Sequence, residues 1–446
     1  MAFSAERNST SGYPAWAKRR YRVEAFDLWH YCSKHIYKPL VRMRIDFDGH
    51  LDEAVLAKAL EQSCVTFPLI ACAFDTTPPI RPRWVPRREA TREILQVVET
   101  QGDDHREEAI QRSFANSPNI TEGPQLRIFL VRNSERDTLC LISNHMLYDG
   151  AGLRRYIRSV ARLYSRIAEG IAPSPAPFVR QRGIWPVLKG FRLRDRLFTP
   201  ARMGMPATEV GKKLLQTAGF AFEDGPFDLL AVSLPAESFK PLRATAKALG
   251  FTVNDLLVSA LALAWHRVRK VDEFLLPCTM NLRGFAPPGV KMGITNFTCQ
   301  CICAIRIAPS DMIENVMAKL VTSMKRYKQG VPGLCQLIGC WLLATFLPFR
   351  RMEQALRDIA TSFPICASNA GIIGEDCVRF GDIPVQSVHL SAPTVFSPAF
   401  IVTMSTFHDE LTIAFNAESD EAAKVFIRTV FAAMIEELKD FGLRHS

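Results

Sequence analysis

Apolar and polar positions follow two spacings along the chain, and the change between them divides it into strands and helices. Residues 40–47 and 299–307 alternate apolar and polar side chains, which is typical of a strand with one buried face. Residues 51–64 and 421–438 instead repeat apolar side chains every three or four positions, which is typical of an amphipathic helix. Because both halves mix the two patterns, the sequence predicts an α/β protein.

The length of 446 residues predicts two domains of roughly 200 residues each, since one core rarely grows larger. We expect an N-terminal lobe over residues 1–178 and a C-terminal lobe over residues 224–446. Residues 179–223 form the predicted crossover, where basic residues interleave with apolar ones between Trp185 and Phe198. Such a stretch fits either a membrane surface or an acidic carrier. The alternative, which we favour, is a linker with solvated arginines.

The most informative stretch follows the apolar run 138–142, which predicts a buried strand in a hairpin with residues 125–131. His145 comes directly after this strand and Asp149 four residues later. Gly150 then opens an amphipathic helix that continues to about residue 168. This order places an imidazole on a loop beside a carboxylate, with glycines where the backbone turns or something approaches closely.

Histidine is the usual general base, because its ordinary pKa lies near physiological pH. A single histidine at a strand end is more often structural, but the combination of His145 with Asp149 and Gly150 favours catalysis. We interpret the other histidines as surface or packing residues: His30, His35, His50, His105, His266, His389, His408 and His445.

The residues from His145 to Gly150 resemble the HxxxDG motif of the superfamily that contains chloramphenicol acetyltransferase. Plant BAHD acyltransferases, nonribosomal-peptide condensation domains, polyketide-associated acyltransferases and wax-ester synthases share this motif. The resemblance implies two chloramphenicol-acetyltransferase-like α/β lobes with an active-site tunnel between them. It also implies transfer of an acyl group to a hydroxyl or amine without a covalent intermediate. His145 is then the general base, and the donor is a thioester of coenzyme A or of phosphopantetheine on an acyl carrier protein.

The resemblance extends to shorter stretches of the second half. It implies that Asp149 is structural and pairs with an arginine, for which Arg283 is our candidate, and that Gly150 keeps the tunnel open. Asn144 marks a departure, because condensation domains and wax-ester synthases usually have a second histidine there. The expected tunnel-lining residues are Asn144, Asn281, Asn296, Ser368 and Asn369.

The amino-acid composition limits the classes of binding partner that we expect. The formal net charge of +10 favours an anionic substrate, carrier or membrane surface. We expect no nucleic-acid partner, because the 45 acidic residues are spread among 55 basic ones and no binding motif is present. The 12 cysteines include no CxxC pair, so we expect no bound metal or redox pair. Cys299, Cys301 and Cys303 share one strand face, where buried packing is favoured over a soft metal.

So many thiols, with no signal peptide at the start, favour a cytoplasmic location. Residues 333–349 qualify this prediction, since 17 mostly apolar residues lie between basic flanks. A span takes about 20 apolar residues, so a buried or surface-docked helix is our first interpretation. Peripheral membrane contact is the second and a true span the third.

The sequence leaves three functions open. The first is an acyltransferase acting on a small-molecule alcohol or amine. The second is a free-standing condensation-type domain that forms amides. The third is a non-catalytic member of the same fold that binds a carrier or a lipid. The intact His145 and Asp149 favour the two enzymes.

Overall fold

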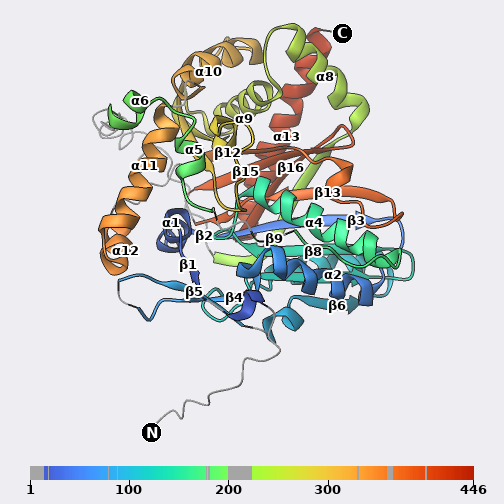
Figure 1. The fold of residues 1–446 in the computed structure, drawn as a ribbon. Coiled ribbons are helices and arrows are strands. Elements are labelled where there is room, and N and C mark those ends of the chain that lie inside the picture. The colour runs from blue at the N-terminus through green and yellow to red at the C-terminus, as the bar shows by residue number, and fades with distance from the viewer. Residues whose placement is uncertain are drawn as a thin grey trace.

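The computed structural model describes residues 15–18, 20–78, 80–87, 89–176, 178, 181–198, 224–328, 331–358, 365–396 and 399–445. Helices and strands alternate throughout these ranges (Figure 1). The helices of the first half are α1 (Ala25–Cys32), α2 (Glu53–Thr66), α3 (Gly102–Ala115), α4 (Gly150–Ala168), α5 (Trp185–Leu188) and α6 (Leu193–Phe198). Those of the second half are α8 (Ala236–Ala248), α9 (Val253–Arg269), α10 (Ile313–Lys328), α11 (Val331–Phe346), α12 (Phe349–Asp358) and α13 (Glu421–Arg444).

Two large sheets form the centres of two lobes. The N-terminal lobe holds a sheet in the order β13-β3-β8-β7-β6, and the C-terminal lobe one in the order β11-β10-β12-β15-β16-β9. The first sheet contains β3 (Leu40–Phe47), β6 (Leu95–Glu99), β7 (Leu126–Arg132), β8 (Asp137–Asn144) and β13 (Val385–Ser391). The second contains β9 (Asp224–Leu234), β10 (Glu273–Asn281), β11 (Thr298–Arg306), β12 (Ile365–Ile372), β15 (Phe400–Phe407) and β16 (Glu410–Ser419).

Two small sheets complete the strands. One has the order β1-β5-β4 and the other pairs β14 with β2. Their strands are β1 (Tyr21–Arg22), β2 (Tyr37–Lys38), β4 (Cys72–Asp75), β5 (Arg83–Pro86) and β14 (Thr394–Val395).

The hairpin predicted before His145 is confirmed, since β7 and β8 pair antiparallel. The prediction of one exposed face for β3 is wrong, because the strand is buried on both faces along almost its whole length. One face of the sheet packs against α2 and α4, and α3 with part of the second lobe covers the other. The side chains of residues 40–47 therefore point alternately into two different cores, and not alternately into a core and into solvent.

The second lobe follows its predicted pattern closely. Thr252 caps α9 and exchanges hydrogen bonds with Asp255 in the predicted capping box. Helices α8, α9, α10 and α13 build one core with the six-stranded sheet (Figure 1). Cys299, Cys301 and Cys303 are buried, as expected for packing residues. Within the described ranges, no group of three histidine, cysteine or acidic side chains is placed to hold a metal ion.

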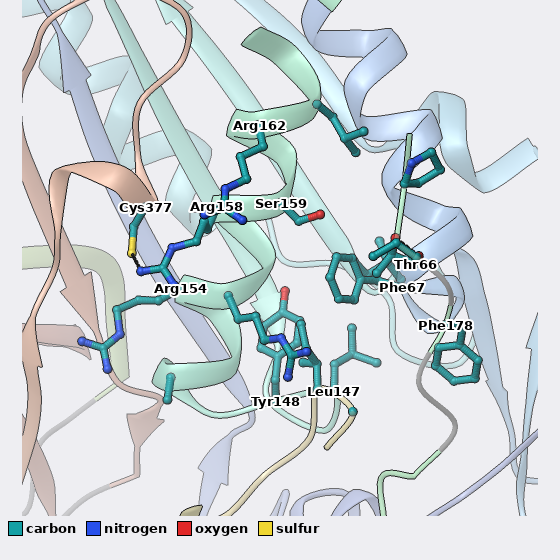
Figure 2. Close-up of a pocket in the computed structure, with 18 of the residues that line it drawn as sticks. Thr66, Phe67, Leu147, Tyr148, Arg154, Arg158, Ser159, Arg162, Phe178 and Cys377 are labelled. Atoms are coloured by element: carbon teal, nitrogen blue, oxygen red, sulfur yellow. Dashed lines mark hydrogen bonds between the residues drawn. The ribbon is translucent and has the colours of Figure 1, made fainter. Parts of the chain in front are cut away.

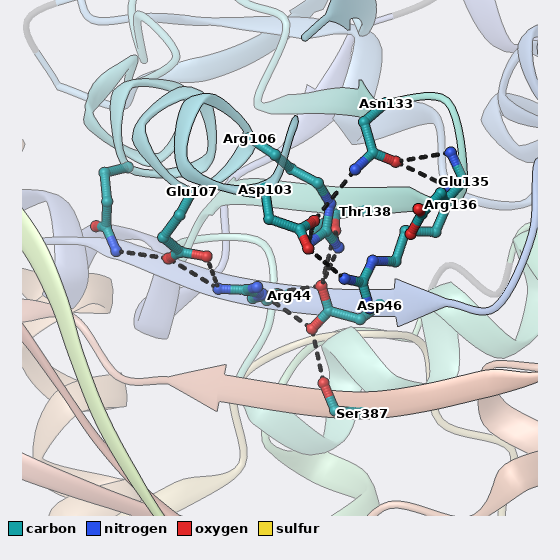
Figure 3. A network of polar contacts seen from close by, with 11 residues as sticks. Arg44, Asp46, Asp103, Arg106, Glu107, Asn133, Glu135, Arg136, Thr138 and Ser387 are labelled. Atoms are coloured by element: carbon teal, nitrogen blue, oxygen red, sulfur yellow. Dashed lines mark hydrogen bonds and ion pairs between the residues drawn. The ribbon is translucent and has the colours of Figure 1, made fainter. Parts of the chain in front are cut away.

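The first lobe takes one strand of its sheet from the second half of the chain. β13 pairs antiparallel with β3, and a polar cluster centred on Asp46 joins them (Figure 3). The Asp46 carboxylate accepts hydrogen bonds from Arg44 (2.9 Å), Thr138 (2.7 Å) and Ser387 (2.6 Å) and lies 3.1 Å from Arg106. The predicted lobe boundaries at residues 178 and 224 therefore do not separate the two sheets, because β13 follows residue 224 but belongs to the first sheet. The predicted crossover 179–223 lies largely outside the described residues.

The apolar stretch 333–349 forms α11 and the start of α12. These helices pack on α1, where Tyr31 contacts Phe349 with ring centroids 5.6 Å apart. Among the described helices, none is both long and apolar enough to cross a bilayer alone, whereas α8 and α9, bent by 107°, meet the length and composition criteria as a pair. Both helices of that pair contribute buried residues to the core of the second lobe.

Candidate active site

The loop from His145 to Asp149 links β8 to α4 and lies against the second lobe. Asp149 has extended backbone geometry and caps α4, because its carboxylate accepts from the Gly152 amide at 3.0 Å. Asn144 holds the start of the loop: its side chain donates to Gln125 at 2.6 Å and accepts from the Met146 amide at 3.0 Å. A helix cap and an amide clamp thus fix both ends of the loop.

Asp149 joins the two lobes. Its Oδ2 atom accepts hydrogen bonds from Arg283 at 2.7 Å, the Phe297 amide at 2.9 Å and the Thr298 hydroxyl at 2.9 Å. Burial opposes ionisation, but Arg283 and the backbone donors outweigh it and lower the pKa of the Asp149 carboxyl below its usual value. The ion pair expected between Asp149 and Arg283 is present, and both carboxylate oxygens accept hydrogen bonds from the protein.

His145 lies beside a second histidine. Its ring stacks on that of His30 from α1, with centroids 4.3 Å apart and planes inclined by 25°. Both residues are half-buried. Burial lowers the pKa of His145, and burial together with His145 lowers the pKa of His30 further. Both rings are therefore neutral near pH 7, the state in which an imidazole accepts a proton.

Two polar side chains surround the histidine pair. The His30 Nδ1 atom shares a hydrogen bond with the Tyr37 hydroxyl. Asn296 donates from Nδ2 to the His145 carbonyl oxygen at 2.7 Å, and its side chain favours the protonated form of both rings. Asn296 thus links the second lobe directly to His145.

The remaining predicted residues divide into two groups. Asn281 accepts from the Arg283 amide at 3.0 Å, so it orients the arginine. Asn369 accepts from the Gly371 amide at 2.8 Å and donates to Asn254 at 3.2 Å, which places it in a strand irregularity of β12. Ser368 lies half-buried in the same strand. These last two do not contact the histidine pair in any hydrogen bond of the described structure.

Asn144 corrects one expectation. It is fully buried, and its amide is bonded to Gln125 and Met146, so it lies inside the protein rather than along a tunnel. Its polar groups are already satisfied, because a buried amide without partners would be costly. Asn144 consequently shapes the loop instead of meeting a substrate.

The two glycines of the motif differ in the space around them. A Cβ on Gly150 would meet only a Leu390 methyl group at 3.6 Å, which is an ordinary contact. A Cβ on Gly152 would overlap that of Tyr148 and lie 3.2 Å from Ile294. Close packing of the described residues therefore requires a glycine at 152 and permits a side chain at 150.

His30 is the site residue that sequence reasoning missed. It lies 115 positions before His145, within an ordinary amphipathic helix and outside any motif. Only the packing of α1 against the loop brings the two rings together, so no pattern in the sequence marks the pair.

Known proteins resemble this chain weakly in sequence and clearly in fold. No protein-family model matches the chain. Two uncharacterized proteins of Mycobacterium tuberculosis, from strains CDC 1551 / Oshkosh and ATCC 25618 / H37Rv, are each 29% identical over 290 residues. The match covers 61% of this chain and 65% of each relative, so it spans just under two thirds of their length.

Solved structures resemble almost the whole chain. A trichothecene 15-O-acetyltransferase from Fusarium sporotrichioides has a TM-score of 0.68 at 13% identity and covers 95% of both chains. The first condensation domain of the CDA synthetase has a TM-score of 0.66 at 15% identity, covering 96% of this chain and 98% of its own. Polyketide synthase associated protein 5 from Mycobacterium tuberculosis has a TM-score of 0.64 at 14% identity, covering 95% and 98%. At these identities the likeness is one of fold. The chain therefore has the two-lobed α/β fold that this condensation domain and this acetyltransferase share.

Proposed function

We propose that the protein is an acyltransferase that moves an acyl group from a thioester to a hydroxyl or amine, with His145 as general base. The observation that carries this proposal is the neutral, half-buried imidazole of His145 on a loop that is tied to both lobes. Asp149 and Asn296 make these ties through Arg283 and the His145 carbonyl. A base held this rigidly needs little reorganisation before it acts.

The proposed reaction uses the imidazole twice. As the acceptor oxygen or nitrogen attacks the thioester carbon, His145 takes its proton. The tetrahedral intermediate then collapses, the C–S bond breaks, and the imidazolium returns the proton to the leaving thiolate. Protons balance over the cycle, and no residue other than His145 needs to change its charge.

His30 adds a positioning role to this proposal. The stacked ring holds the plane of His145, and the Tyr37 hydroxyl holds His30 in turn. Because two adjacent imidazolium ions would repel, the neutral state of His30 leaves room for one proton on His145. We therefore assign His30 to orientation of the base and not to proton transfer.

The donor is proposed as a thioester of coenzyme A or of phosphopantetheine on an acyl carrier protein, consumed as a co-substrate. The acceptor is a small-molecule alcohol or amine. The 12 cysteines suit a reducing compartment, which supports a cytoplasmic location. The alternative, a condensation-type domain that forms amides, uses the same base and differs in its donor, which is an acyl carrier protein thioester, and in its acceptor nitrogen.

Mass spectrometry of reactions with mixed acyl-CoAs and candidate alcohols and amines tests the proposal. We expect a mass increase of one acyl group on an acceptor with the wild-type protein and none with His145→Ala. His105→Ala, on an exposed face of α3, is the matched control and retains activity. Equal product from His145→Ala and wild type would overturn the assignment.

A further inference from the structure

A cavity of about 720 Å³ lies on the outer side of α4, next to the loop that carries His145 (Figure 2). Leu147 and Tyr148 of that loop line it, as do Gly293 and Ile294, which lie close in sequence to Asn296 and Phe297, the residues that contact His145 and Asp149. Its size falls within the range of small-molecule sites, roughly 300–1,000 Å³. The mechanism described above uses none of its charged side chains.

One wall of the cavity is a ladder of arginines. Arg154, Arg158, Arg162 and Arg166 follow one another at intervals of four along α4, and Arg155 adds a fifth guanidinium. Residues four apart lie on one face of a helix, so these side chains form a single stripe. Figure 2 shows Arg154, Arg158 and Arg162 along one side of the helix.

The positive charge of this ladder is little neutralised. No aspartate or glutamate of the described chain lines the cavity. Arg154 and Arg155 donate to the backbone carbonyls of Ile372 and Met292, at 2.8 Å and 2.7 Å. Arg158 pairs with the exposed Asp376 at 3.0 Å. Burial lowers the pKa of Arg154, and the nearby charges of Arg158 and Arg283 add to this effect, as expected for crowded guanidinium groups.

The opposite wall is apolar. Phe67, at the end of α2, and Phe178 stand across the cavity from the arginines (Figure 2). Leu69, Ile70 and Leu163 also line the cavity. Aromatic rings and guanidinium planes both stack on flat, conjugated ligands, and arginine binds phosphate through two parallel hydrogen bonds.

We propose that this cavity binds the phosphorylated nucleotide end of a coenzyme A thioester, with the base against the apolar wall and the phosphates on the arginine ladder. This inference rests on the proposed acyltransferase function and decides its donor in favour of coenzyme A. A concave site with an aromatic wall suits a flat nucleotide, whereas an acidic carrier helix would meet a convex basic surface. The arginines thus act in binding and not in the chemical step.

Calorimetric titration with adenosine 3′,5′-bisphosphate tests the site in the full-length protein. We expect one saturable site, and we expect Arg158→Ala combined with Arg162→Ala to weaken binding by about tenfold to hundredfold, the usual effect of losing charged hydrogen bonds. Arg112→Ala removes an exposed arginine on α3 outside the cavity and should leave the affinity unchanged. Adenosine without phosphates should bind at least about tenfold more weakly.

Three results of the nucleotide titrations would overturn the inference. They are the absence of saturable binding, equal affinity in the double variant, and equal affinity for pyrophosphate, which would indicate a merely electrostatic surface. Saturable binding of an acidic acyl carrier protein in place of the nucleotide would overturn it as well.

A thioester of N-acetylcysteamine, which lacks the nucleotide, separates this inference from the function. If acyl transfer from this thioester depends on His145 but the protein does not bind the bisphosphate, the acyltransferase function is supported and the nucleotide site is contradicted. Arginine-dependent binding of the bisphosphate with no transfer from any thioester would support the nucleotide site and contradict the proposed acyltransferase function.

Discussion

The ring of His30 stacks on that of His145, with centroids 4.3 Å apart, although the two residues belong to different elements. Burial lowers the pKa of both rings, and His145 adds to the lowering at His30. Two stacked imidazoles in a partly desolvated site resist protonation, because each new charge loses water and repels the other ring. We therefore expect this pair to make the protein sensitive to mild acid.

Stability should fall between pH 7 and pH 5. Folding lowers the pKa of both histidines below the value near 6.5 that they have in the unfolded chain. The folded state is therefore fully stable above pH 6.5 with respect to these groups, and it loses stability as the pH falls from 6.5 toward the pKa of the folded state. Urea unfolding at several pH values measures this loss. His30→Phe keeps an aromatic ring in the stack and should flatten the dependence. An identical slope in the variant would contradict the role of the pair.

Activity should show the same lowered pKa. We expect the acid limb of kcat/KM to lie below 6.5, because His145 must be neutral to accept a proton and its pKa lies below the ordinary value. His30→Ala should reduce kcat more than it changes KM, since it disturbs orientation of the base. A limb at or above 6.5 in the wild-type protein would show that His145 is not the titrating base.

Loss of the Asp149 carboxylate should damage folding as much as chemistry. Asp149→Ala leaves the Arg283 charge without its partner and removes the cap of α4. Breaking a buried ion pair costs about 3–5 kcal/mol, and loss of a cap adds about 1 kcal/mol. Chemical denaturation measures the change. Asp104→Ala, at an exposed position of α3, is the control, and a similar unfolding midpoint for both variants would exclude the structural role.

The two motif glycines should respond differently to alanine. Gly152→Ala forces a methyl group against Tyr148 and Ile294, so we expect a loss of about 1–3 kcal/mol in unfolding free energy, as for overpacked cores. Gly150→Ala has room and should change stability by less than about 0.5 kcal/mol. If Gly150→Ala also lowers donor affinity, the tunnel role expected for this glycine gains support. Equal destabilisation by both would contradict the packing described here.

The pairing of strand β13 with β3 should depend on Asp46. Asp46→Ala removes the acceptor shared by Arg44, Thr138 and Ser387, so we expect a loss of about 1–3 kcal/mol. Burial opposes ionisation, but Arg44 and the hydroxyl donors lower the pKa of Asp46, so the stabilisation is present above the ordinary value of 3.8 and is lost as the pH falls below it. Hydrogen exchange of β13 amides measures local opening. Unchanged exchange rates of the β13 amides in the variant would show that the Asp46 cluster does not stabilise this strand.

Much of the architecture follows from local pattern. The hairpin before His145, the helix from Gly150 to Ala168 and the cap at Thr252 are settled by residues close in sequence. Periodicity, turn residues and helix caps act over a few positions, so they can be recognised without a tertiary structure. The HxxxDG motif belongs to this class and pointed to the fold that the structural comparisons then showed.

Only the tertiary structure decided which residues share the site. His30, His145 and Asn296 come from three distant segments: α1 packs against the loop and brings the two rings together, and Asn296 reaches the same loop from the second half of the chain. The same holds for β13, which pairs with β3 although about 340 residues separate them, and for the arginine ladder, whose cavity needs walls from the end of α2 and from Gly293 and Ile294. Periodicity states which face of an element is buried, whereas contacts between distant faces depend on how all the elements pack together. The sequence by itself marked His145 and Asp149 as candidate site residues, and packing determined what surrounds them.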